Sequence, residues 1–339
     1  MNASTGKSLA EVFQKFHDFC ATENWRGYDP YDGLNSPLAR LLPGKKARQA
    51  WTQLHKRSVI NFRPLCGITP QLNSTAVALF AMGSGDEKLL DVLDSLRTPE
   101  GGWGYPFPWQ SRAFYAPVNS PNLICTVVAL KAFRKFNRKC DTHFVESLIT
   151  ERNGEKWIRY IPESDTQVHN INFMGAALLG NKECMAFSVK RQQPDGSWRY
   201  GEAANQRWID NFHTGYNLVA LREYQQLTGD TSFADAARRG FEYWDRTFWH
   251  EDGTPLYYHN QAWPVDIHCS AQGILTYLAF GNVEKAEWVA RWALKNMWDS
   301  RGYFWYQRSR LFCNRIQYTR WSQAWMYYAL AELIKAKGE

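Results

Sequence analysis

Six segments of the chain share one pattern, a short polar or aromatic opening followed by a run of small and apolar residues. They cover residues 71–80, 120–130, 168–178, 210–221, 266–275 and 320–330. Their starts recur at a spacing of about 50 residues, which is room for two helices and two connections. Because these runs carry little charge, they predict helices that are buried on all sides.

Amphipathic helices are predicted between these runs, at 87–97, 144–151, 233–249 and 283–298. In the third of them, small and aromatic residues form one stripe and charged residues occupy the other face. A consecutive pair of such helices cannot bury both apolar faces alone, whereas a closed ring can. The pattern therefore predicts an all-α fold, an (α/α)6 toroid or barrel with six buried inner helices inside a ring of outer ones.

Glycine-containing turns follow the outer helices at 99–105, 194–198, 251–254 and 299–305, where short β-turn or hairpin connections are expected. No long Gly/Ser linker or low-complexity tract divides the chain. We therefore expect a single toroid domain over residues 1–339, with residues 1–24 forming an N-terminal outer helix.

Composition adds a preference for ring-shaped ligands. Apolar residues make up 45% and charged residues 22%, as in a soluble globular protein, but aromatic residues reach 15%. Part of this excess must be core, and part is suited to stacking on sugar rings. The net charge of +7 would suit an anionic substrate such as a uronic-acid glycan. The densest basic run, 45–48, is interpreted as a solvated helix face, and no nucleic-acid motif is present.

The seven cysteines are widely scattered and include no C-x-x-C pair, which indicates reduced thiols and a cytoplasmic location. The first residues lack the apolar core of a signal peptide. No run approaches the roughly 18 apolar residues of a membrane span. We therefore expect a cytoplasmic protein without a transmembrane segment.

Several motifs resemble those of known toroids. The stretch Q-Q-P-D-G-S-W at 192–198 is similar to a repeat of the squalene-cyclase and prenyltransferase toroids, although the aspartate-rich acid motif of those cyclases is absent. D-N-F-H-T-G-Y at 210–216, P-V-D-I-H-C-S-A-Q-G at 264–273 and R-W-S-Q-A-W-M-Y-Y-A-L at 320–330 look like sugar-active six-hairpin toroids. From about residue 25 onward the chain resembles bacterial cytoplasmic toroid proteins encoded with capsule and exopolysaccharide biosynthesis genes. That resemblance implies a glycan substrate, and other polysaccharide-biosynthesis proteins as partners, and it leaves the reaction open.

A toroid brings the polar openings of its inner helices together at one end, where free N–H groups also favour anions. The convergent groups would be Asn73, Asn119, Asn122, His169, Asn170, Asp210, His213, Tyr216, Asp266, His268, Arg320 and Gln323. Connecting loops would add Trp103, Tyr105, Trp109, Tyr115, Trp263 and Tyr318.

His213 and His268 are the best acid–base candidates, because histidine titrates near neutral pH, and Tyr216, Asp210 and Asp266 could assist them. The other members of the set are candidates for substrate binding. Each has a structural alternative, since Asp and Asn at helix starts are common N-caps and Arg320 could form a buried ion pair. No H-x-x-x-H or H-E-x-x-H spacing favours a metal, and no cofactor is expected.

The mixture of His, Asn, Tyr and Arg suits proton abstraction beside a uronate carboxylate, with Arg320 neutralising that carboxylate. The outcome would be C5 epimerisation or β-elimination during surface-polysaccharide biosynthesis. A glycoside hydrolase using Asp210 and Asp266 is an alternative, because glycosidases need two carboxyl groups, for which Asp29, Asp32 and Glu202 are substitutes. A non-catalytic glycan-binding or scaffold protein is a third reading.

Overall fold

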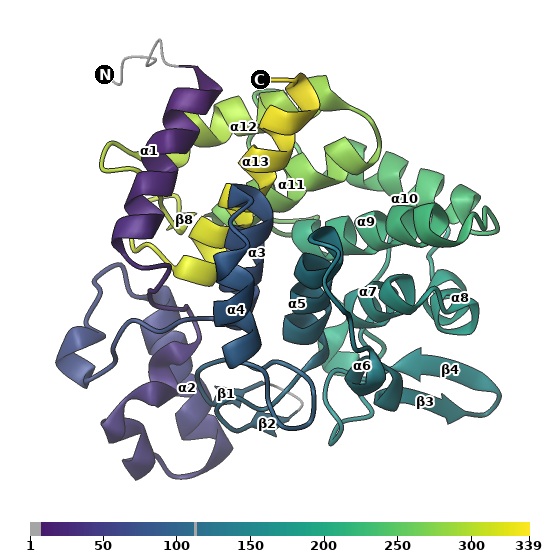
Figure 1. Cartoon of the computed structure of the whole chain (residues 1–339), viewed down its shortest axis with the longest axis horizontal. Helices are drawn as coiled ribbons and strands as arrows, with labels where there is room; N and C mark the ends of the chain where they lie inside the picture. Colours follow the sequence, from purple (N-terminus) through teal and green to yellow (C-terminus); the bar gives the residue numbers. More distant parts are fainter. Residues whose placement is uncertain (1–7, 112–113) are drawn as a thin grey trace.

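The chain forms an α/α toroid, a ring of six inner helices surrounded by outer helices (Figure 1). The computed structural model describes residues 8–111 and 114–339. The inner helices are α3 (Ser74–Ser84), α5 (Leu123–Lys135), α7 (His169–Leu179), α9 (Asn211–Thr228), α11 (Ile267–Ala279) and α13 (Trp325–Lys337). Each packs against the next and α13 packs against α3, so the ring closes. The predicted fold class is confirmed.

The outer helices pack against the outside of this ring. They are α1 (Leu9–Thr22), α4 (Lys88–Ser95), α6 (His143–Ser147), α8 (Lys182–Val189), α10 (Ala234–Thr247) and α12 (Val283–Met297). The helix predicted over 144–151 is wrong in its second half. Residues Ile149–Arg152 form strand β3, because the β-branched Ile149 and Thr150 pair with Ile158 and Trp157 of the neighbouring strand.

Short antiparallel strands connect the helices. They are β1 (Trp109–Gln110) with β2 (Tyr115–Ala116), β3 with β4 (Glu155–Ile158), β6 (Trp298–Asp299) with β7 (Tyr303–Phe304), and the three-stranded sheet of β5 (Val265–Asp266), β8 (Gln307–Arg308) and β9 (Cys313–Asn314). In the D-G-S-W turn, Gly196 has φ of 96°, and a Cβ there would lie 2.4 Å from the Arg239 carbonyl oxygen. Trp198 of the same turn is buried and donates to the Ser188 carbonyl, so this motif has a packing role.

The inner helices are buried on nearly every side, as their composition predicts. One continuous cluster of buried apolar residues extends from Phe16 in α1 to Leu333 in α13. Small residues allow the helices to approach closely. At Gly215 of α9, an added Cβ would lie 2.7 Å from Cγ of Gln272 in α11. The ring therefore depends on glycine at this contact between the two helices.

A further helix, α2 (Gly44–Arg57), lies outside the alternation of inner and outer helices. It belongs to an irregular segment that also contains the short helices η1 (Asp32–Asn35), η2 (Pro37–Leu41) and η3 (Pro64–Cys66); η4 (Ala204–Gln206) lies elsewhere. Trp51 of α2 donates to the Gly33 carbonyl at 2.8 Å, and His55 is fully buried. Arg48 donates to Gln110 Oε1 of β1 and lies over the Tyr115 ring of β2, so α2 lies beside these two strands, near one end of the ring (Figure 1).

None of the described helices is long and apolar enough to cross a membrane. All seven cysteines are free thiols, as their scattered positions predict.

Candidate active site

A cavity of about 540 Å³ opens at the end of the toroid where the six inner helices begin. Its size is typical of a small-molecule site. Every inner helix, or the turn leading into it, contributes to the lining, through Thr75, Ile124, Asn170, His213, His268 and Arg320 among others. The sequence-based prediction that the six openings face one common space agrees with this arrangement.

Asp210 and His213 form a hydrogen-bonded pair on the cavity wall. Asp210 is the N-cap of α9, and its Oδ1 accepts from the His213 backbone N–H. Its Oδ2 lies 2.6 Å from His213 Nδ1 and also accepts from Trp208 Nε1. A carboxylate can only accept here, so Nδ1 carries the proton and Nε2 is left as the basic nitrogen. The His213 side chain is 22% exposed, and among the described residues none hydrogen-bonds to Nε2.

Tyr216 and His268 form a second pair in the same wall. His268 Nδ1 lies 3.0 Å from the Trp321 carbonyl oxygen, which can only accept, so Nδ1 donates. The Tyr216 hydroxyl therefore donates to His268 Nε2 over 2.7 Å. Burial lowers the pKa of His268 to about 3, and burial raises the pKa of Tyr216 well above its usual value. His268 is therefore neutral at physiological pH and fixes the direction of the tyrosine hydroxyl.

Phe212 joins the two pairs. Its ring centroid lies 4.2 Å from that of His213 and 4.9 Å from that of His268. The rings of Trp321 and His268 stack at 4.5 Å. The two predicted acid–base histidines are thus neighbours in one cavity.

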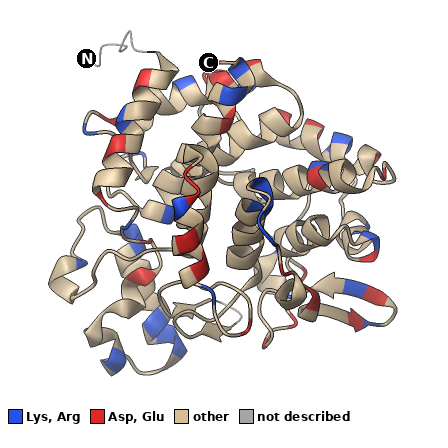
Figure 2. Cartoon of the chain, in the orientation of Figure 1, with Lys and Arg blue, Asp and Glu red and all other residues tan. Residues whose placement is uncertain are grey.

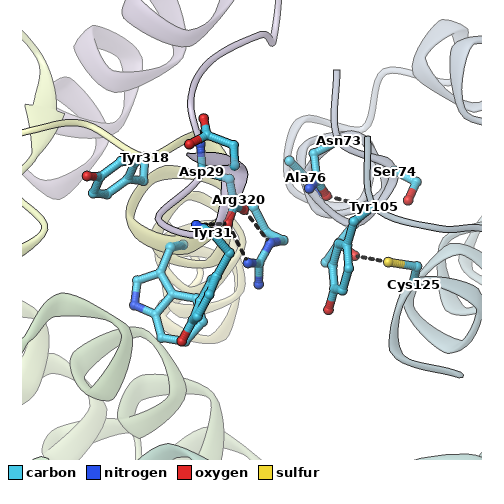
Figure 3. A network of polar contacts seen from close by, with 12 residues as sticks. Asp29, Tyr31, Asn73, Ser74, Ala76, Tyr105, Cys125, Tyr318 and Arg320 are labelled. Atoms are coloured by element: carbon cyan, nitrogen blue, oxygen red, sulfur yellow. Dashed lines mark hydrogen bonds and ion pairs between the residues drawn. The ribbon is translucent and has the colours of Figure 1, made fainter. Parts of the chain in front are cut away.

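Arg320 lines the cavity, but its charge is already balanced within the protein. It makes a bidentate ion pair with Asp29, at 2.7 and 2.9 Å, and its guanidinium lies over the Tyr105 ring (Figure 3). The Asp29 carboxylate raises the pKa of Arg320 further, against the effect of burial. A π-helical turn, η5 (Thr319–Ala324), precedes α13 and places Arg320 and Trp321 against the cavity.

Asp266 lies outside the cavity lining. It is the fully buried N-cap of α11, and its oxygens accept from the His268 backbone, from Trp321 Nε1 and from Gln307 Nε2. Burial raises its pKa to about 6. All of its partners are protein donors, so the geometry gives it a structural role. The structure does not bring Asp210 and Asp266 together as two carboxyl groups facing one ligand.

The remaining candidates divide into two groups. Asn170, Tyr105 and Trp109 line the cavity with the residues above. Those that do not line it are Asn73, Trp103, Tyr115, Asn119, Asn122, His169, Trp263, Tyr318 and Gln323. Asn73 and Asn122 are N-caps of α3 and α5.

The side chain of His169 faces away from the cavity. Its Nε2 donates to Glu202 at 2.9 Å, and its Nδ1 accepts from the Ser188 hydroxyl at 3.0 Å. Gln323 bonds both backbone groups of Phe304, and Tyr318 accepts from Arg63, which is paired in turn with Asp32. These contacts hold the fold around the cavity.

Sequence reasoning missed two contributions to the lining. One is the face of α2 formed by Gln49, Thr52, Gln53, Lys56 and Arg57; the other is a set of aromatic residues, Tyr31, Phe107, Phe114, Tyr160, Tyr200, Trp208, Phe212, Tyr257, Tyr258, Trp321 and Trp325. The aromatic excess of the composition was the available signal for the second set, but it gave no positions.

Within the described residues, no three His, Cys, Asp or Glu side chains are grouped so as to hold a metal ion. Asn170 and Gln206 both line the cavity and are about 95% buried. Each has an amide oxygen without a hydrogen-bond partner among the described residues.

No protein-family model and no curated protein matches the sequence. Solved structures match its fold. An unsaturated glucuronyl hydrolase specific for heparin has a TM-score of 0.58 at 12% identity, covering 98% of each chain. The cellobiose 2-epimerase from Bacillus thermoamylovorans has a TM-score of 0.54 at 10% identity, covering 78% of this chain and 88% of that one. The ent-copalyl diphosphate synthase from Streptomyces platensis has a TM-score of 0.56 at 18% identity, covering 99% of this chain and 68% of that one. Its structural neighbours thus include carbohydrate-active enzymes, at identities that establish the toroid fold alone.

Proposed function

We propose that this protein is an enzyme that removes a carbon-bound proton from a sugar or uronic-acid glycan, as an epimerase or a lyase. The observation that carries the proposal is the Asp210–His213 pair. Asp210 accepts from His213 Nδ1 at 2.6 Å, and Nε2, the nitrogen that can take up a proton, belongs to a partly exposed ring on the cavity wall. This is the arrangement of a general base oriented by a carboxylate.

In the proposed reaction, His213 Nε2 takes the proton from the carbon next to a carbonyl or carboxylate group of the substrate. The C–H electron pair moves toward that group and forms an enolate-like intermediate. A proton from solvent water then adds to the opposite face and gives the epimer, and His213 releases the abstracted proton to solvent. Departure of a leaving group from the next carbon gives an unsaturated sugar instead. The Tyr216 hydroxyl donates its single proton to His268 Nε2, so it offers the cavity an acceptor for a substrate hydroxyl.

The cavity favours this chemistry over two-carboxylate hydrolysis. Asp210 is the only carboxylate that the described residues contribute to the lining, whereas glycosidases commonly need a pair. The carbohydrate part of the proposal is supported by the aromatic lining. The names of two structural neighbours, a glucuronyl hydrolase and a cellobiose epimerase, are consistent with it.

Incubation with a panel of acidic and neutral oligosaccharides in deuterated water tests the reaction. Deuterium at a ring carbon identifies an epimerase, absorbance from a new double bond identifies a lyase, and new reducing ends without either would favour a hydrolase. H213N should abolish deuterium uptake and leave oligosaccharide binding within about threefold. Full activity in H213N would refute the proposed base.

A glycan-binding or scaffold protein remains the second candidate, because the same cavity could bind a sugar without turning it over. Ligands that bind in the cavity and show no exchange, elimination or cleavage would favour it.

We further propose that the reaction edits a glycan during surface-polysaccharide biosynthesis in the bacterial cytoplasm, a proposal that rests on the sequence resemblance described above. Deleting the gene should change the uronic-acid composition of the surface polysaccharide, and complementation with the H213N variant should not restore it. An unchanged polysaccharide would argue against this context.

A further inference from the structure

Helix α2 presents a polar face to the cavity. Gln49, Thr52, Gln53, Lys56 and Arg57 all line the cavity, and their spacing places them on one side of a helix. On the same helix, Leu54 is 53% exposed to solvent. A helix usually buries its apolar stripe and exposes its polar one. In α2 the side that borders the cavity is polar, with Thr52 buried, Lys56 half-buried and Arg57 exposed, so these side chains are available to a ligand in the cavity.

Two cations of this face have no carboxylate partner. Lys56 Nζ donates to the Tyr31 hydroxyl at 2.7 Å and lies 4.6 Å from the centre of the Tyr31 ring. Among the described residues no carboxylate forms an ion pair with Lys56, and none forms a hydrogen bond or ion pair with the exposed Arg57. Arg320, the third cation of the lining, is neutralised by Asp29.

The segment around α2 is rich in basic residues. Residues 33–85 contain Arg40, Lys45, Lys46, Arg48, Lys56, Arg57 and Arg63 and no Asp or Glu. Arg63 is buried and ion-paired with Asp32, so the other six cations supply the positive charge of this segment. Figure 2 shows Lys and Arg on α2 without neighbouring acidic residues on that helix. This cationic face would attract an anionic ligand to the cavity.

We propose that Lys56 and Arg57 form an anion subsite that binds the carboxylate of an acidic sugar. This inference rests on the proposed function and names its substrate class. The last turn of α2 suits the two cations, because the partial negative charge of a helix C-terminus stabilises them there. The sequence alone assigns neutralisation of the substrate carboxylate to Arg320. Because Arg320 is already paired, we assign that role to Lys56 and Arg57.

A continuous series of ring contacts links Lys56 to the proposed base. Lys56 Nζ lies 6.0 Å from the Trp321 ring centre, Trp321 stacks on His268, and Phe212 contacts both His268 and His213. A carboxylate held at Lys56 therefore leaves the attached sugar ring beside the aromatic wall that leads to His213. Pairing the carboxylate with a cation also favours proton loss from the neighbouring carbon, because it stabilises the charge that develops.

Binding measurements on a matched pair of probes test the subsite. The probes are an oligosaccharide of alternating hexuronic acid and hexose, and the same oligosaccharide after reduction of its carboxylates to primary alcohols. Isothermal titration should show the acidic form binding to the full-length protein about 10- to 100-fold more tightly. K56Q and R57Q should each remove most of that difference and leave binding of the reduced form unchanged.

K46Q is the matched control, since Lys46 is exposed on the same helix and does not line the cavity. It should retain the preference for the acidic form. Equal affinities for the two probes, equal losses in K46Q and K56Q, or no binding of either probe would each overturn the subsite. The H213N variant separates this inference from the proposed reaction. A carboxylate preference that depends on Lys56, without deuterium uptake by the wild type, would keep the subsite and refute the reaction.

Discussion

Asp210 both caps α9 and forms a hydrogen bond with His213 Nδ1. The substitution D210N separates these two roles. In D210N, the amide oxygen can still accept from the His213 backbone N–H, and Asn is as good an N-cap as Asp. The amide nitrogen replaces Oδ2, however, and cannot accept from Trp208 Nε1 or His213 Nδ1. Hydrogen bonds to a charged group contribute about 1.5–3 kcal/mol each, and removal of the buried charge offsets part of the loss. We expect the free energy of unfolding to fall by about 2 kcal/mol.

The effect on the reaction should be larger. The amide favours the tautomer of His213 that carries its proton on Nε2, and that tautomer cannot act as the base. General-base catalysis is worth about 10²- to 10⁴-fold, so deuterium uptake should slow by that factor. Mass spectrometry gives the uptake rate, and urea unfolding gives the stability.

N282A is the control, because Asn282 caps the outer helix α12 through the Lys285 backbone N–H, and it does not line the cavity. It should lose about 1 kcal/mol of stability and keep the wild-type rate. A D210N protein that is folded and exchanges deuterium within threefold of the wild type would refute the role given to this pair.

Three further predictions concern the surroundings of the cavity. Burial raises the pKa of Asp266 from 3.8 to about 6, so its contribution to stability is fully present below about pH 4 and is lost as pH rises through 6. The stability of the wild type relative to D266N should therefore fall by on the order of 3 kcal/mol between pH 4 and pH 7, and parallel pH profiles in chemical denaturation would contradict this. G215A should destabilise the toroid by about 1–3 kcal/mol, because its Cβ would lie 2.7 Å from Gln272 Cγ. An unchanged melting temperature would show that the Gln272 side chain moves aside without cost. H169Q should lower the free energy of unfolding by about 1 kcal/mol, because it alters the contacts with Ser188 and Glu202, and deuterium uptake should stay within threefold of the wild type. A large loss of rate would show that His169 takes part in the reaction.

The comparison of sequence and structure shows which part of the site could be predicted. Six apolar runs with polar openings were enough to predict the toroid and the end at which its inner helices begin. Helices that are buried on all sides require a closed ring. Because each inner helix is buried on all sides, its sequence does not show which of its sides faces the cavity. His169 and Asn170 are adjacent, about 100° apart around α7, and only Asn170 faces the cavity. No apolar stripe in the sequence distinguishes the two directions.

The sequence also could not reveal partners that are distant along the chain. Arg320 has its carboxylate partner 291 positions earlier, at Asp29, and nothing local to either residue indicates the pair. The contribution of α2 to the cavity lining was missed for a different reason. A basic, weakly apolar helix is usually a solvated surface, and only its packing through Trp51 and His55 turns its polar side toward the cavity.

The ion pair between Asp29 and Arg320 has a consequence for synthesis of the protein. The cavity wall is complete only after the segment that contains Arg320 and α13 has been synthesised. This segment supplies the partner of Asp29, and α13 also closes the ring against α3. During translation, the N-terminal helices emerge with an inner face that has no partner, which is a state prone to aggregation. A ribosome-bound chain that stops before residue 319 should therefore expose apolar surface to chaperones and have no ligand-binding ability, however well its first five inner helices have formed.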